Sequence, residues 1–135
     1  MITYTDDLAG IGPQQFHGFF QDWPNPPTTA SHLRLLQQSD EVVLAQDETD
    51  QRIVGFITAI TDGVLCAYLP LLEVLPECQV RGIGSELVRR MLKKLDHFYM
   101  IDLLCEADLK PFYERVGMTS ASGMMIRNYA WQSGS

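Results

Sequence analysis

The 135-residue chain lacks the features that mark membrane, secreted and zinc-binding proteins. No stretch approaches the roughly 18 consecutive apolar residues of a membrane span. The N-terminus has neither a cationic segment nor a signal-like apolar core. The three cysteines are odd in number and form no Cys-x-x-Cys pair, so neither a disulfide framework nor a structural metal site is expected. These absences predict a cytoplasmic protein with reduced thiols, no metal and no membrane partner.

Basic charge is also scarce. Ten Lys and Arg residues face 17 Asp and Glu residues, which gives a net charge of −7. Nucleic acids and anionic membranes select basic surfaces, so neither is an expected partner. An acidic balance suits a cationic small substrate, but more often it only keeps a protein soluble. Hydrophobic residues make up 46% and charged residues 20%, as in ordinary globular proteins, so we expect residues 1–135 to form one domain.

What the chain does contain is an alternation of strand and helix patterns. Apolar and β-branched runs predict strands at 2–5, 41–46, 52–60, 64–74, 99–105 and 124–129. Helical spacing and capping residues predict helices from Pro13, from Thr28 or Thr29, at 82–95 and at 109–116. The order β-α-α-β-β-β-α-β-α-β-β predicts an α/β fold of the mixed (α+β) type, with a mixed sheet flanked by helices.

Pro70 interrupts the longest apolar run, 64–74. A proline has no N–H to donate to a sheet ladder, so a strand that contains one is unpaired, bulged or splayed at that point. We therefore expect the pairing of this strand to break near Pro70.

The same strand leads into a glycine-containing turn, Arg81-Gly82-Ile83-Gly84, and then into a strongly amphipathic helix. Free N–H groups and the dipole at a helix N-terminus bind phosphate, and glycine lets the backbone approach an anion. A dinucleotide fingerprint would need a third glycine where Leu87 stands, and a P-loop would need a lysine. On the glycines alone, a phosphate site and a plain strand-to-helix turn are equally supported.

Two strings then resemble the hallmarks of the Gcn5-related N-acetyltransferases. Gln79, Gly82 and Gly84 match the Gln/Arg-x-x-Gly-x-Gly/Ala pattern of the acetyl-CoA-binding segment. The string 112–118, Phe-Tyr-Glu-Arg-Val-Gly-Met, matches the family's Phe-Tyr-Glu-x-x-Gly-Phe-like string, with Met118 in place of the usual aromatic residue. The element order also matches the acyl-CoA N-acyltransferase fold over essentially the whole chain. The resemblance implies direct acetyl transfer from acetyl-CoA to a primary amine in a ternary complex.

The resemblance also implies where acetyl-CoA binds. Its pantetheine arm would lie where strands 64–74 and 99–105 splay apart, against backbone groups of Leu72 and Val74. A backbone N–H aimed at the acetyl oxygen would stabilise the oxyanion. The pyrophosphate would rest on the N–H groups of 81–85, while the basic residues of 89–94 mainly form a solvated helix face. The expected cofactor-binding residues are Leu72, Val74, Gln79, Arg81, Gly82, Ile83, Gly84 and Ser85.

Two residues are catalytic candidates. Tyr113 matches the family's usual proton donor to the coenzyme A sulfur, and a phenol with a pKa of about 10 can serve as that acid. The alternative for Tyr113 is a core aromatic residue beside Phe112. Glu73 is an acid in an otherwise apolar strand and is a candidate base, with a surface or interface carboxylate as the equal alternative. Glu106 is a second candidate base, and a water chain is a third.

Acceptor recognition is expected from Trp23, Tyr68 and Glu106. Trp23 and the prolines after it would form a rigid wall, with a hydrophobic plug as the alternative reading. Tyr68 would hold a water. Asp22, Asp62 and Glu106 could supply negative charge for an amine, but solvated loop acids are the default interpretation. The short chain favours a small-molecule amine, with a peptide or protein amine and a non-catalytic acyl-CoA-binding regulatory domain as alternatives. Dimers are common among such relatives, so pairing of a C-terminal edge strand with a second copy is also open.

Overall fold

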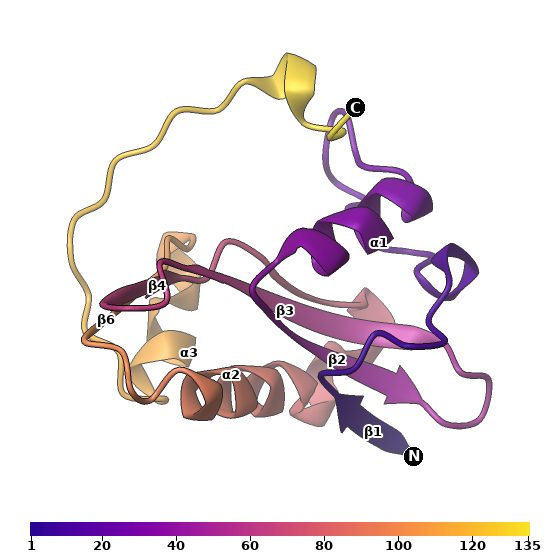
Figure 1. Cartoon of the computed structure of the whole chain (residues 1–135), viewed down its shortest axis with the longest axis horizontal. Helices are drawn as coiled ribbons and strands as arrows, with labels where there is room; N and C mark the ends of the chain where they lie inside the picture. Colours follow the sequence, from indigo (N-terminus) through magenta and orange to yellow (C-terminus); the bar gives the residue numbers. More distant parts are fainter.

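The computed structural model describes residues 1–135, apart from the side chain of Val80. A six-stranded mixed sheet forms its centre, with α1 (Thr29–Gln38) on one face and α2 (Ile83–Lys94) on the other (Figure 1). The sheet consists of β1 (Ile2–Thr5), β2 (Glu41–Asp47), β3 (Ile53–Thr61), β4 (Cys66–Tyr68), β5 (Leu72–Val74) and β6 (Met100–Asp102). A short helix, α3 (Lys110–Glu114), follows β6 after the 3-10 turn η3 (Ala107–Leu109). The predicted fold class is confirmed.

The strands follow the order β1-β2-β3-β4-β6, and β5 also pairs with β3. β3 therefore holds β2 on one edge and the shorter β4 and β5 in succession on the other. These pairs are antiparallel, whereas β4 and β6 are parallel. The single run predicted at 64–74 is thus two short strands with Pro70 between them, which confirms the expected break.

The helix α2 buries the apolar face that its sequence predicts, including Ile83, Leu87 and Met91. It packs closely on the sheet because β3 has a glycine beneath it. A Cβ at Gly55 would lie 3.0 Å from Leu87 Cδ1 and 3.3 Å from Ile83 Cγ2. Each such buried side chain stabilises the fold by about 1.5–3 kcal/mol, so this face anchors the helix whose N-terminus borders the site.

The opposite face of α2 is solvated and charged, as predicted. Glu86 forms ion pairs with Arg89 and Arg90, and Lys94 pairs with Asp6 at 2.6 Å. Exposed pairs of this kind contribute at most about 1 kcal/mol each. Three of the four basic groups on this face, those of Arg89, Arg90 and Lys94, therefore already have acidic partners.

On the α1 side, His32 lies inside a cluster of aromatic rings. Its ring centroid is 4.4 Å from that of Phe56 and 4.8 Å from that of Phe20. Burial lowers the pKa of His32 to about 4, so the imidazole is neutral at physiological pH. The cluster fixes the loop that contains Phe20 against the sheet.

Two predicted parts of the fold are wrong. The helix expected from Pro13 is only the 3-10 turn η1 (Pro13–Gln15). Gly18 and Phe20 then take positive φ angles of 99° and 63°, which a right-handed helix cannot contain.

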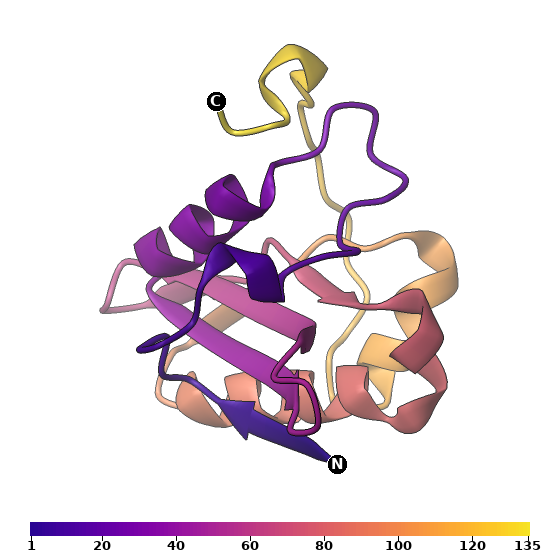
Figure 2. The same cartoon turned by 90° about the vertical axis from the view of Figure 1, so that its right-hand side faces the viewer.

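The strand expected at 124–129, and with it the pair of strands that ends the predicted order, does not form. Residues 118–128 are irregular instead and make a C-terminal arm. The arm leaves the body near β6 and α3 and returns to the α1 side of the molecule (Figures 1 and 2). It ends in a C-terminal strap, residues 129–135, that begins with the 3-10 turn η4 (Tyr129–Trp131).

Candidate functional site

A cleft opens where the pairing of β4 with β6 ends. The last paired residues are Tyr68 and Asp102, and the N–H of Leu69 donates to the carbonyl of Asp102 at 2.9 Å. Beyond this point β5 pairs with β3 instead, and the chain after β6 diverges from it. A cavity of about 570 Å³ lies between residues 69–74 on one side and 103–106 on the other. The predicted splaying of these two segments is therefore present.

The backbone groups of Leu72 and Val74 face this cleft. In an antiparallel pair, residues that exchange hydrogen bonds with the partner alternate with residues that do not. The carbonyl of Leu71 accepts from β3 at 3.0 Å, and the N–H of Leu75 donates to β3 at 2.9 Å. Residues 71, 73 and 75 therefore turn their main-chain groups toward β3. The N–H and C=O groups of Leu72 and Val74 consequently point away from β3, into the cleft.

The turn between β5 and α2 leaves helical N–H groups free. It consists of the 3-10 helix η2 (Pro76–Arg81) and Gly82, which has a φ of 74°. The first bond of α2 runs from the N–H of Glu86 to the carbonyl of Gly82 at 3.1 Å. The N–H groups of Ile83, Gly84 and Ser85 precede it and have no helical acceptor. No side chain of the described residues caps this helix. Such an N-terminus can hold an anion.

The two glycines of the turn serve different purposes. Gly82 needs its left-handed backbone, and the space where its Cβ would lie is open. A Cβ at Gly84 would lie 3.6 Å from Phe112 Cζ and 3.7 Å from Val74 Cγ2, which are ordinary contacts. A methyl group therefore fits at Gly84, and a larger side chain would press on α3. Gly82 shapes the turn, and Gly84 sets the distance between α2, β5 and α3.

Two further residues of the predicted cofactor site differ in their positions. The Gln79 side chain lines the cleft, and its amide donates to the carbonyl of Val74 at 3.1 Å. It thereby ties the turn to β5. The Arg81 guanidinium lies 3.8 Å from the Cys78 sulfur and is outside the described lining of the cleft. A contact of Arg81 with a phosphate stays a prediction.

Tyr113 enters the cleft from α3. Its ring packs edge-on against Phe112 at a centroid distance of 4.9 Å. Burial, with a smaller effect of neighbouring Cys105, raises the pKa of Tyr113 to about 12. The phenol is therefore fully protonated at neutral pH and is a hydrogen-bond donor within the cleft.

Glu73 lies across the cleft, half-buried on the α1 side of the sheet. It is opposite Phe56 in the β3–β5 register, so alternation places it on the face away from Val74. Its carboxylate accepts the N–H of Phe20 at 3.0 Å and 3.3 Å through its two oxygens. Burial raises the pKa of Glu73, the Phe20 bond lowers it, and nearby Asp22 raises it further; the net direction is upward. This carboxyl is a stronger base than one in water.

Phe20 is a part of the site that sequence reasoning missed. Its φ of 63° is uncommon for a residue other than glycine, and such strain tends to occur at functional sites. The conformation aims its N–H at Glu73 while its ring enters the aromatic cluster. No local pattern signals a left-handed phenylalanine, because the cluster that stabilises it comes from α1 and β3.

The predicted acceptor-side residues are only partly brought together. Trp23 and Glu106 line the cleft, as does Asp22. Tyr68 lies at the end of β4, 37% exposed and outside the described lining. Asp62 belongs to a distant turn, where its carboxylate accepts the N–H groups of residues 64, 65 and 66. Tyr68 and Asp62 are therefore not among the described residues that line the cleft.

The arm adds two lining residues that the sequence did not indicate. Met125 and Arg127 border the cleft from outside the sheet. The segment was expected to be a strand, and nothing in its periodicity places it beside the cleft. Cys105 also lines it, next to Tyr113.

Within the described part of the chain, no three His, Cys, Asp or Glu residues lie close enough together to hold a metal ion. The helices described here are also too short or too polar for any of them to cross a membrane.

Comparisons with known proteins agree with this geometry. The family model described as acetyltransferase (GNAT) family matches residues 13–118. A crystal structure of a candidate acetyltransferase from Deinococcus radiodurans R1 is 44% identical, with a TM-score of 0.94 over 98% of this chain and 92% of that one. A GNAT family acetyltransferase from Streptococcus pneumoniae TIGR4 is 27% identical, with a TM-score of 0.76 over 95% and 98% of the two chains.

A curated relative also matches part of the chain. The chloroplastic GCN5-related N-acetyltransferase 3 of Arabidopsis thaliana is 38% identical over 68 residues. The match covers 49% of this chain and 29% of that protein, so the chain spans under a third of the length of this relative.

Proposed function

Because the chain belongs to the acetyltransferase (GNAT) family, we propose that it transfers the acetyl group of acetyl-CoA directly to the primary amine of a small molecule. The observation that carries this proposal is the cleft between β5 and the chain after β6. One edge of the cleft is the outward-facing backbone of Leu72 and Val74, and the same chain leads on to the free N-terminus of α2. A thioester and a diphosphate, the two recognisable parts of acetyl-CoA, each have a matching surface.

The substrate acetyl-CoA would be held mainly by main-chain groups. The pantetheine amides suit the N–H and C=O groups that Leu72 and Val74 turn into the cleft. The Val74 carbonyl already accepts the Gln79 amide, which leaves the N–H of Val74 and both main-chain groups of Leu72 for acetyl-CoA. The N–H of Val74 would stabilise negative charge on the acetyl oxygen. The diphosphate suits the N–H groups of 83–85.

Glu73 is the proposed base. An alkylamine attacks only when neutral, so the ammonium must first lose a proton. Burial raises the pKa of Glu73, which strengthens its carboxylate as an acceptor, and the Phe20 N–H holds it in place. The C–N bond then forms, and the proton passes from nitrogen through Glu73 to solvent. We expect the acid limb of the pH dependence of kcat/KM to lie above the ordinary pKa of a glutamate and to disappear in Glu73→Gln.

Tyr113 acts on the leaving sulfur. When the carbonyl re-forms, the C–S bond breaks and its electron pair stays on sulfur as a thiolate. A phenol with a pKa of about 12 holds its proton more tightly than a thiol with one of about 8.5, so full proton transfer to sulfur is uphill. Tyr113 therefore stabilises the thiolate by donating a hydrogen bond, and the thiolate takes its proton from solvent. The sequence suggested that Tyr113 transfers a proton to the sulfur, and we propose instead that it only donates a hydrogen bond.

The proposal is tested by calorimetric titration with acetyl-CoA, followed by measurement of thiol release with a panel of amines. We expect saturable binding and release of one thiol for each amide formed. An absence of acetyl-CoA binding would overturn the proposal. Binding without release for any amine would favour a regulatory acyl-CoA-binding domain, and release only with peptides or proteins would favour a macromolecular acceptor.

The extent of the domain (1–135), a cytoplasmic location and pairing with a second copy stay predictions from the sequence. Light scattering after size-exclusion chromatography tests the last of these.

A further inference from the structure

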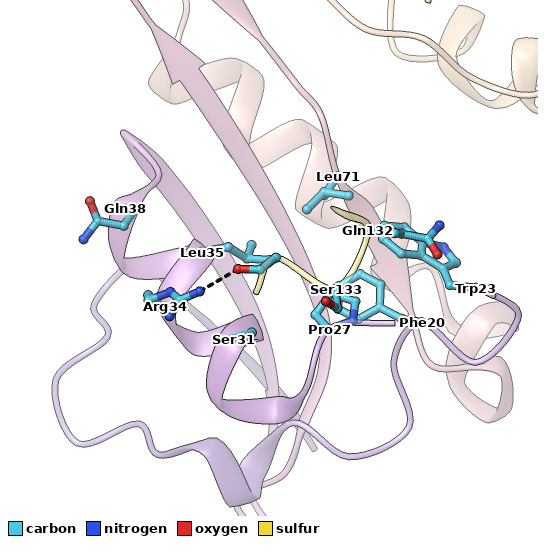
Figure 3. Close-up of a pocket in the computed structure, with 11 residues that line it drawn as sticks. Phe20, Trp23, Pro27, Ser31, Arg34, Leu35, Gln38, Leu71, Gln132 and Ser133 are labelled. Atoms are coloured by element: carbon cyan, nitrogen blue, oxygen red, sulfur yellow. Dashed lines mark hydrogen bonds between the residues drawn. The ribbon is translucent and has the colours of Figure 1, made fainter. Parts of the chain in front are cut away.

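A second cavity, of about 260 Å³, lies beside the cleft and beneath the C-terminal strap. Figure 3 shows α1 on one side of it and Phe20, Trp23 and Leu71 on the other, and the strap residues Gln132 and Ser133 also line it. Of the site residues predicted from the sequence, only Trp23 lines this cavity. The strap residues could not be predicted, because it is the irregular C-terminal arm that brings them back to α1.

The two cavities share a wall. Phe20, Trp23 and Leu71 line both of them. Phe20 connects them most directly, because its N–H binds the Glu73 carboxylate and its ring packs on Trp23 at a centroid distance of 4.6 Å. The two cavities are therefore neighbours, separated by the side chains that they share.

The second cavity is suited to an apolar group. Its wall includes the apolar side chains of Trp23, Pro27, Leu35 and Leu71, and no carboxylate of the described residues lines it. The one charged group in the described lining is Arg34, whose guanidinium already donates to the carbonyl of Gly134 at 2.8 Å (Figure 3). A second ammonium group would find no partner here and would face the charge of Arg34.

The strap that covers this cavity is held by few bonds. Asn25 donates from its N–H to the Gln132 side chain at 2.8 Å and from its side-chain amide to the carbonyl of Tyr129 at 3.3 Å. With the Arg34 bond, these contacts all lie at exposed positions, where water competes for the same groups. The strap can therefore open to admit a molecule and close over it.

We propose that the second cavity holds the apolar body of the acceptor, beneath the C-terminal strap, while the amine lies beside Glu73. This inference rests on the proposed function and names its substrate class: a primary amine carried on an aryl or branched alkyl group. Polyamines and lysine side chains of folded proteins do not meet these requirements.

The experiment compares 2-phenylethylamine, ethylamine and spermidine as acceptors at saturating acetyl-CoA. We expect kcat/KM to be at least tenfold higher for 2-phenylethylamine than for either other amine. Ser31→Phe should fill the cavity from α1 and raise KM for 2-phenylethylamine at least tenfold, while ethylamine kinetics and acetyl-CoA affinity stay unchanged. Gln37→Phe is the matched control, because Gln37 is exposed on the same helix and outside the cavity lining.

A measurement on the unmodified chain makes the test independent of the folding of any variant. In a 2-phenylethylamine titration followed by ¹H–¹⁵N NMR, the amides of Ser31 and Gln132 should shift. If acetyl-CoA binds but spermidine is the better acceptor, or Ser31 and Gln132 do not shift, the acceptor class is wrong and the proposed function survives. If acetyl-CoA does not bind, the proposed function itself fails.

Discussion

The proposed cofactor half and acceptor half of the cleft are formed by different kinds of groups, main-chain groups in one and side chains in the other. The proposed cofactor half consists of main-chain groups from one continuous stretch, from the outward edge of β5 through Gly82 to the first turn of α2. The acceptor half consists of side chains gathered from the Phe20 loop, β5, the segment after β6 and the C-terminal arm. A backbone site tolerates most changes of side chain as long as the turn keeps its shape. A side-chain site changes its preference with single residues, which suits the part of an enzyme that selects the acceptor.

The sharpest contrast within the cofactor half concerns Gly84. We expect Gly84→Glu to reduce acetyl-CoA affinity more than 100-fold, because the side chain presses on Phe112 and brings negative charge to the N-terminus of α2. Gly84→Ala is the control, since its Cβ makes only ordinary contacts, and should bind within about threefold of the unmodified chain. Calorimetry measures both. Equal acetyl-CoA affinities for the two variants would show that the diphosphate does not bind at this turn.

Tyr113 lies where the two halves meet. We expect Tyr113→Phe to lower kcat about 100-fold, as removal of one hydrogen bond to a developing negative charge typically does, and to leave acetyl-CoA affinity nearly unchanged. Tyr99→Phe, at a residue 82% exposed and away from the cleft, should have unaltered kinetics. Steady-state thiol release distinguishes the variants, and an undiminished kcat for Tyr113→Phe would refute its role at the sulfur.

A comparison of Gly82 with Gly63 separates the effect of backbone strain on stability from its effect on acetyl-CoA binding. Both Gly82 and Gly63 have positive φ, of 74° and 77°, and both have open space around a Cβ. Alanine at either position should cost about 1–2 kcal/mol of stability. Only Gly82→Ala should also weaken acetyl-CoA binding, by roughly the same free energy, which is about tenfold. Denaturant unfolding and calorimetry check the pair, and an equal loss of affinity in Gly63→Ala would contradict the account.

The smallest expected effect is on stability and concerns Glu73 in the acceptor half. Its pKa is raised in the folded state, so its ionisation at neutral pH opposes folding. We expect Glu73→Gln to raise Tm by about 1 °C at pH 7, because the group is only half-buried. The difference should close as pH falls through the raised pKa, and below a pH of about 4.3 the two proteins should melt alike.

Thermal melts at pH 7 and pH 4 measure this difference. Glu48→Gln, in the exposed turn after β2, is the matched control for the change of a glutamate to glutamine. A Glu73→Gln protein that is less stable at pH 7 would show that the carboxylate stabilises the loop through Phe20 more than its burial costs.

The contrast between the halves also explains how much the sequence could predict. The periodicity of α2, the glycines at 82 and 84 and the break at Pro70 are local signals, and they predicted the helix, the turn and the splayed segments that border the cleft. Binding of acetyl-CoA there was implied only by the family resemblance. The positive φ of Phe20 and the placement of Met125 and Arg127 depend on packing between distant segments. The apolar residues at 124–126 suggested a strand, yet Met124 is 96% exposed and Ile126 84% exposed in the arm. Local patterning cannot report whether a neighbouring strand exists to pair with.

Binding of acetyl-CoA by the main-chain groups of β5 and the α2 N-terminus is tested most directly by an acetyl-CoA titration of the ¹⁵N-labelled chain, followed by NMR. We expect the largest shifts at the amides of Leu72, Val74, Ile83, Gly84 and Ser85. Much smaller shifts are expected for the amides of the acceptor half, such as Trp23 and Arg127. Shifts concentrated in the Phe20 loop and the strap, with the α2 N-terminus unmoved, would contradict this mode of binding.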